Sequence, residues 1–174
     1  MSTQERRGPV HDFLAADHAR LDALLDRATT SAGDLDAAPF EEFRGGLLRH
    51  IGMEEKVLLP AVRRANGGTP HPLASRLRRD HSAIAMLLVP TPTRAIVEEI
   101  VSILAPHNAI EEGTDGVYAA CDRLPPDDVA LVLKQLRSYP QVKLAPHFDG
   151  PGVYRHAEDA LRAASVNRAS EVDR

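Results

Sequence analysis

The chain has 174 residues, a formal net charge of −4 and 26% charged residues, which is the profile of a single globular domain. It has no basic block and no interleaving of basic with aromatic residues, so a nucleic-acid partner is not expected. No apolar run approaches the roughly 20 residues that span a bilayer, and the first residues lack the apolar core of a signal peptide. We therefore expect a cytoplasmic protein with no membrane partner. The single cysteine, Cys121, excludes an internal disulfide and a cysteine-rich zinc site, and we expect it to be buried.

Clusters of helix-breaking residues at 31–34, 66–70, 89–92 and 124–128 divide the chain into segments. Within each segment the apolar residues repeat with the period of a helix. The stripes begin with Leu14 and Leu21 in the first segment, Phe40 and Phe43 in the second, Leu77 and Ile84 in the third, and Ile100 and Leu104 in the fourth, which continues to Tyr118 and Cys121. The short connections predict an all-α protein, an antiparallel up-and-down four-helix bundle over residues 10–123. In the second helix, Pro60 should cause a kink or begin the last turn.

The ends of the chain are expected to differ from the bundle. Residues 1–9 should be a disordered N-terminus and residues 167–174 a frayed tail. Residues 124–166 should form a C-terminal helical extension that packs on the bundle, with a short helix near 127–139 and a last helix near 153–166. This extension suits a cap over apolar helix surface, a dimer contact or a lid.

Six polar side chains interrupt the apolar stripes: His18, His50, Glu54, His81, His107 and Glu111. Burying histidine or glutamate is costly unless the group is paired, hydrogen-bonded or bound to a metal. One such residue would mean little, but the motif His-x-x-x-Glu occurs twice, and residues four apart share a helix face. A second glutamate follows each motif, so the two halves of the bundle form a weak internal repeat.

These six side chains also agree in height along the bundle. With a rise of about 1.5 Å per residue, alternating helix directions place all six in one layer, about 12–20 Å from the same end. Six nitrogen and carboxylate ligands exceed the four that one zinc ion normally takes, so two metal ions bridged by Glu54 and Glu111 fit better. Imidazole and carboxylate without thiolate suit iron, manganese or zinc.

This arrangement of ligands resembles that of the hemerythrin-like (HHE cation-binding) family. The resemblance covers about residues 10–122 and includes the stretches DHARLDALLDRA, HIGMEEKVLLPAV, DHSAIAMLL and HNAIEEGTDGVY. It implies a four-helix bundle holding two non-haem iron ions with an oxo or hydroxo bridge, with manganese or zinc as alternatives. It also implies dioxygen, peroxide or nitric oxide as small ligands, because members of the family carry or sense oxygen, respond to nitric oxide, handle iron or break down peroxide.

Two positions depart from the oxygen-carrying hemerythrins. Those proteins have a further histidine one turn after the third-helix histidine, where this chain has Ala85, and an aspartate where this chain has Glu111. The missing ligand implies an open coordination position and favours reaction with dioxygen or peroxide over reversible carriage. An enzyme of this kind would be a catalase-like oxidoreductase acting in oxidative stress. The alternatives are a non-enzymatic module that senses oxygen, redox state or nitric oxide or binds iron, working as a homodimer or with a separate signalling partner, and a bundle without metal.

Several other polar residues either take part in the site or lie apart from it. Tyr118 is either a core residue with a satisfied hydroxyl or a group that reaches the centre. Glu55 and Glu112 are either solvated or paired with arginine, or they orient a ligand imidazole. We expect His11 at the surface. His71 lies in a proline-rich turn. His147 and His156 lie in the extension, and one of them would gate the site if the extension folds over it.

Overall fold

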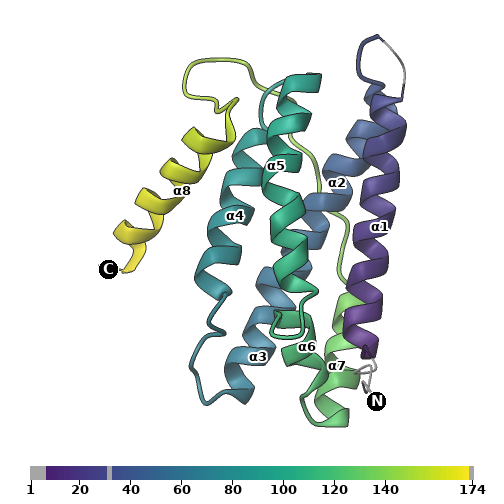
Figure 1. Cartoon of the computed structure of the whole chain (residues 1–174), viewed down its shortest axis with the longest axis vertical. Helices are drawn as coiled ribbons and strands as arrows, with labels where there is room; N and C mark the ends of the chain where they lie inside the picture. Colours follow the sequence, from purple (N-terminus) through teal and green to yellow (C-terminus); the bar gives the residue numbers. More distant parts are fainter. Residues whose placement is uncertain (1–6, 31–32, 173–174) are drawn as a thin grey trace, which may run out of the picture.

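The computed structural model describes residues 7–30 and 33–172, and this part of the chain is helical without strands. The bundle consists of α1 (Pro9–Thr29), α2 (Ala37–Met53) continued by the π-helical turn η1 (Glu54–Leu58) and α3 (Leu59–Ala65), α4 (Ala74–Leu87) and α5 (Arg94–Glu111). These units run alternately up and down (Figure 1). The predicted all-α, antiparallel four-helix bundle is therefore confirmed. Of the N-terminal segment expected to be disordered, residues 1–6 lie outside the described residues, and Pro9 is already helical.

The second helix changes its hydrogen-bonding register just before Pro60. Proline has no backbone N–H, so it cannot donate the next bond of the α-helical ladder. The amide of Leu59 instead donates to the carbonyl of Glu54, which closes a π-helical turn, and Pro60 lies in the first turn of α3. Such turns within helices occur often at functional sites. Glu54, the first residue of this turn, is one of the six predicted ligands.

The fourth helix is not continuous, contrary to the stripe that we expected to run to Cys121. It ends at Glu111, and a turn over residues 112–116 leads into α6 (Val117–Asp122). Gly116 explains the break, because a Cβ atom at this position would lie 2.1 Å from the carbonyl oxygen of Glu111. Only glycine allows the two backbone segments to come this close.

The C-terminal extension covers the bundle with α7 (Pro126–Arg137) and α8 (Ala157–Val172). The first of these packs against α1 and η1, and the second lies along α4. The connection between them rises from the end of α7 to the upper end of the bundle (Figure 1). It is fixed by Arg49, which donates to the Tyr139 carbonyl, and by Arg44, which donates to the Ala145 carbonyl, each at 2.9 Å. The last helix begins later than expected and continues to Val172 rather than ending at 166. The end of the expected tail, residues 173–174, lies outside the described residues.

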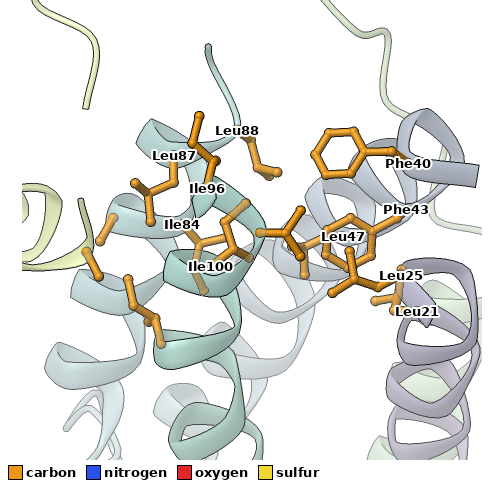
Figure 2. Close-up of a cluster of buried hydrophobic side chains, with 14 of the residues drawn as sticks. Leu21, Leu25, Phe40, Phe43, Leu47, Ile84, Leu87, Leu88, Ile96 and Ile100 are labelled. Carbon is orange, nitrogen blue, oxygen red and sulfur yellow. The ribbon is translucent and has the colours of Figure 1, made fainter. Parts of the chain in front are cut away.

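The core is divided into two apolar clusters. Figure 2 shows the one near the upper end of the bundle in Figure 1, with Leu21, Phe43 and Ile84 among its members. The other includes Leu14 and Leu77, together with residues of α3, α6 and α7. In α1, the residues of the upper cluster follow His18 in sequence and those of the lower cluster precede it. In the next bundle helix this order is reversed relative to its own predicted histidine ligand, and it alternates along the bundle. A polar layer therefore separates the two clusters.

Candidate metal centre

The six predicted side chains meet in this polar layer. They form two overlapping groups, one with Glu54, His81, His107 and Glu111 and the other with His18, His50 and Glu54. Within each group, one potential ligand atom per residue lies within 4.8 Å of all the others. None of the six residues is more than 5% exposed. The structure thus brings together all the residues for which the sequence predicts metal binding.

Each glutamate of the layer faces histidines from both halves of the bundle. Within its own helix, Glu54 Oε1 lies 3.2 Å from His50 Nε2, and Glu111 Oε1 lies 3.1 Å from His107 Nε2. Across the bundle, Glu54 Oε2 is 3.1 Å from His81 Nε2, and Glu111 Oε2 is 3.7 Å from His18 Nε2. Two ligands at right angles around a metal with bonds of about 2.1 Å are about 3 Å apart, so these separations suit two ions bridged by two carboxylates.

A carboxylate holds each of the four histidines from behind, at Nδ1. The pairs are Glu112 with His18 (2.8 Å), Asp17 with His50 (2.8 Å), Glu55 with His81 (2.8 Å) and Asp80 with His107 (3.4 Å). An ionised carboxylate only accepts hydrogen bonds, so Nδ1 carries the ring proton in each case. In the neutral imidazole the lone pair is then on Nε2, which points into the layer. All four histidines are thus oriented for metal binding.

Two buried oxygens of the layer lack a hydrogen-bond donor among the described residues. They are Glu54 Oε2 and Glu111 Oε1, and their residues are 1% and 0% exposed. The nearest histidine nitrogens, Nε2 of His81 and of His107, lie 3.1 Å away but form no hydrogen bond with these oxygens. Buried carboxylate oxygens without a partner are costly and rare. Metal ions between the glutamates and the histidines would satisfy both oxygens, so the donor set fits a pair of cations.

Comparison with known proteins agrees with this geometry. The family model of the hemerythrin HHE cation binding domain matches residues 10–115, which is more than half of the chain. The chain belongs to the hemerythrin HHE cation-binding family. The resemblance noted in the sequence is confirmed. Searches of curated proteins and of solved structures gave no match. Within the described ranges, none of the helices is long and apolar enough to cross a membrane.

Two carboxylates of this hemerythrin-family site were not identified from the sequence. Asp17 and Asp80 each precede a histidine that the sequence predicts as a ligand, but each binds the motif histidine of the following bundle helix, His50 or His107. The repeated Asp-His dipeptide was a signal that could have identified them. Glu55 and Glu112 each orient an imidazole, as one of their two readings has it. Glu55 also pairs with an arginine, Arg78, so both readings apply to it.

The electrostatics of the layer favour added positive charge. Burial lowers the pKa of His50 and of His107, but the neighbouring carboxylates outweigh this effect and raise each pKa to about 10. Burial and the charge of Glu54 raise the pKa of Glu111. Burial raises the pKa of Asp17, but its hydrogen bonds with His50 and Arg20 outweigh this effect and lower the pKa to about 2. Without metal, the layer therefore holds protons that cations would replace.

The other histidines lie outside the six-residue set. His11 is buried, contrary to our expectation, with Nε2 3.3 Å from the carbonyl of Glu112 and its ring edge against Tyr118. Nδ1 of His71 accepts from the backbone of its own turn, at 3.2 Å. In the extension, the histidines pair with surface glutamates, His147 with Glu41 and His156 with Glu99. Neither of these contacts supports the idea of a gate. Cys121 is buried, as expected.

Tyr118 reaches the centre. Its side chain is fully buried, and its hydroxyl lies 2.6 Å from Glu54 Oε1 and 3.3 Å from Glu111 Oε2. The same hydroxyl is 3.1 Å from His18 Nε2 and 3.2 Å from His50 Nε2. Of the two readings that the sequence left open, the structure shows the one in which the hydroxyl enters the ligand layer.

Proposed function

We propose that this protein binds two non-haem iron ions in the buried layer and reacts with dioxygen or peroxide at an open coordination position beside His81. The observation that carries the proposal is the convergence of six buried ligands from four helices, combined with Ala85 where a further histidine would complete the set. Membership of the HHE family supports cation binding. The predicted ligands include no thiolate, so the site suits iron better than it suits the structural zinc of cysteine-rich sites.

The predicted ligands fall into two sets, one for each ion. His18 and His50 would hold one ion, and His81 and His107 the other. Glu54 and Glu111 would complete both ligand sets, since the oxygens of each carboxylate face both histidine pairs. A bound iron pair would supply electrons to, or accept them from, an oxygen–oxygen bond.

The position of Ala85 defines where a small ligand would bind. Residues 81 and 85 share a helix face one turn apart, and a methyl group cannot coordinate a metal. An ion held by His81 and His107 would therefore keep a position for an external ligand. Because the ligand residues are at most 5% exposed and apolar clusters lie on both sides, only a small molecule such as dioxygen or peroxide suits this site.

Metal content and peroxide turnover test the proposal. Protein from iron-supplied cells should contain about two irons per chain, and added peroxide should release one dioxygen for every two peroxides consumed. His50→Ala should lose iron, whereas His156→Ala, which removes an exposed histidine outside the layer, should retain it. Ala85→His should keep the iron and reduce turnover, because the added imidazole can fill the open position.

The outcomes separate the candidate functions. Wild-type protein without iron would refute the proposal. Iron without peroxide turnover or reaction with dioxygen would favour the alternative, a non-enzymatic sensing or iron-binding module.

A further inference from the structure

The Tyr118 hydroxyl occupies a place that the six predicted ligands do not account for. It lies within 3.3 Å of four of their side chains, and it comes from α6, beyond residues 10–115 that the family model matches. A buried tyrosine hydroxyl ordinarily needs one or two hydrogen-bond partners. The Tyr118 hydroxyl, with four close partners, has more than a core tyrosine needs.

Once cations replace the ring protons of the layer, the donors and acceptors around this oxygen do not balance. Tyr118 has one hydroxyl proton, which is donated to Glu54 Oε1 at 2.6 Å. Carboxylates hold the Nδ1 protons of His18 and of His50, so loss of the second ring proton leaves a lone pair on Nε2, within hydrogen-bond distance of the phenol oxygen. Glu111 Oε2, at 3.3 Å, is a further acceptor. One proton cannot serve four acceptors, and a cation among these atoms would turn their lone pairs from mutually repulsive to attractive.

The distances match one coordination sphere. The phenol oxygen is 3.1 Å from His18 Nε2 and 3.2 Å from His50 Nε2. These values are close to the spacing of about 3 Å between neighbouring ligands on a metal with bonds of about 2.1 Å. We propose that Tyr118 is itself a ligand, binding as the phenolate to the iron held by His18 and His50, with its proton released to solvent when the metal binds. This proposal depends on the proposed iron site.

The chain holds Tyr118 firmly in this place. The turn that ends α5 is closed by the Gly116 amide, which donates to the Gly113 carbonyl at 2.8 Å, and it directs α6 back beneath the layer. At the other end of α6, Asp122 accepts from the amides of Val10 at 2.8 Å and of His11 at 2.9 Å. These bonds attach α6 to the first turn of α1. The phenol is thus preorganised before any metal arrives.

A tyrosine ligand would make the two irons unequal. The ion at His18 and His50 would take five protein atoms, counting Tyr118 and one oxygen from each bridging glutamate. The ion at His81 and His107 would take four. The less saturated ion is the one beside Ala85, so a small external ligand would bind on that side only.

Vibrational spectroscopy of the oxidised iron-loaded protein tests this inference. A phenolate bound to ferric iron gives a charge-transfer band in the visible region, and excitation into this band enhances tyrosine ring vibrations in the resonance Raman spectrum. The chain has three tyrosines, which makes assignment by substitution direct. Tyr118→Phe should lose the band and the ring vibrations while keeping both irons, and Tyr139→Phe, which removes a hydroxyl packed against Gly52 of α2, should keep all of them.

The wild-type protein gives a second measurement that needs no variant. Growth on ring-deuterated tyrosine should shift the enhanced vibrations, even if Tyr118→Phe does not fold. Two irons per chain without enhanced tyrosine vibrations would overturn the tyrosine ligand and leave the proposed function standing. A band that persists in Tyr118→Phe would also overturn it, and protein without iron would overturn both proposals.

Discussion

Removing one of the carboxylates behind the ligand histidines should weaken metal binding, and the most informative change is Asp17→Asn. The Asp17 carboxylate accepts from His50 Nδ1 at 2.8 Å, and its side chain is 12% exposed. Asparagine has nearly the same shape but no charge, and its amide nitrogen can face Nδ1 and favour the wrong tautomer. The ligand itself would remain in place, so the change tests the orientation and basicity of His50 and leaves its presence unaltered.

The size of the effect follows from burial. Loss of such a partner lowers metal affinity roughly 10- to 100-fold, which is about 1.4–2.7 kcal/mol. A charged hydrogen bond is stronger where water is excluded. The effect of Asp17→Asn should therefore approach the upper limit. Glu112→Gln, which alters a bond of the same 2.8 Å length to His18 from a side chain that is 31% exposed, should give the smaller loss.

Competition with a chelator for ferrous iron, followed by the metal content of the protein, would measure these affinities. Glu99→Gln is the matched control, because Glu99 also binds a histidine Nδ1, that of His156, but lies outside the layer. We expect no change in metal affinity for this control. The reasoning is wrong if Asp17→Asn binds iron as tightly as the wild type, or if the control loses as much affinity as Asp17→Asn.

Four further predictions concern the layer and its surroundings. Replacing His50 and Glu54 together with leucine should empty the site, yet the variant should resist urea better than the chelator-treated wild type, because the cost of desolvating a buried ion pair can exceed its attraction; equal or lower stability would count against this. Iron binding near neutral pH should release protons from His50 and His107, whose pKa without metal is about 10, so potentiometric titration should show affinity rising with pH toward that value. Since these pKa values are raised, the stability that the charged histidines give the metal-free chain is complete below pH 6.5 and is lost as pH approaches 10. Urea unfolding at constant ionic strength should show this loss, and a stability that rises with pH over this range would contradict it. Gly116→Ala should lower iron content, because the added Cβ would lie 2.1 Å from the Glu111 carbonyl oxygen, and unchanged iron content would refute the role of this turn.

Much of the bundle could be predicted because its signals are local. The helix breakers, the apolar period and the two His-x-x-x-Glu motifs each lie within a few turns of one segment. They identified the four helices and the six side chains that meet. The break after Glu111 was missed, because the polar and apolar pattern continues in phase to Tyr118 and Cys121. What interrupts the helix is a close approach of backbone at Gly116, which periodicity does not record.

The sequence by itself determined which residue types lie in the layer and at what height, since residue spacing along a helix fixes both. Only the tertiary structure decided which carboxylate supports which histidine, as with Asp17, which precedes His18 but binds His50 on the next helix. It also decided that the Tyr118 hydroxyl enters the layer beside His18, a residue 100 positions away in sequence. Such contacts depend on how helices rotate and pack against one another, which no pattern within a single segment specifies.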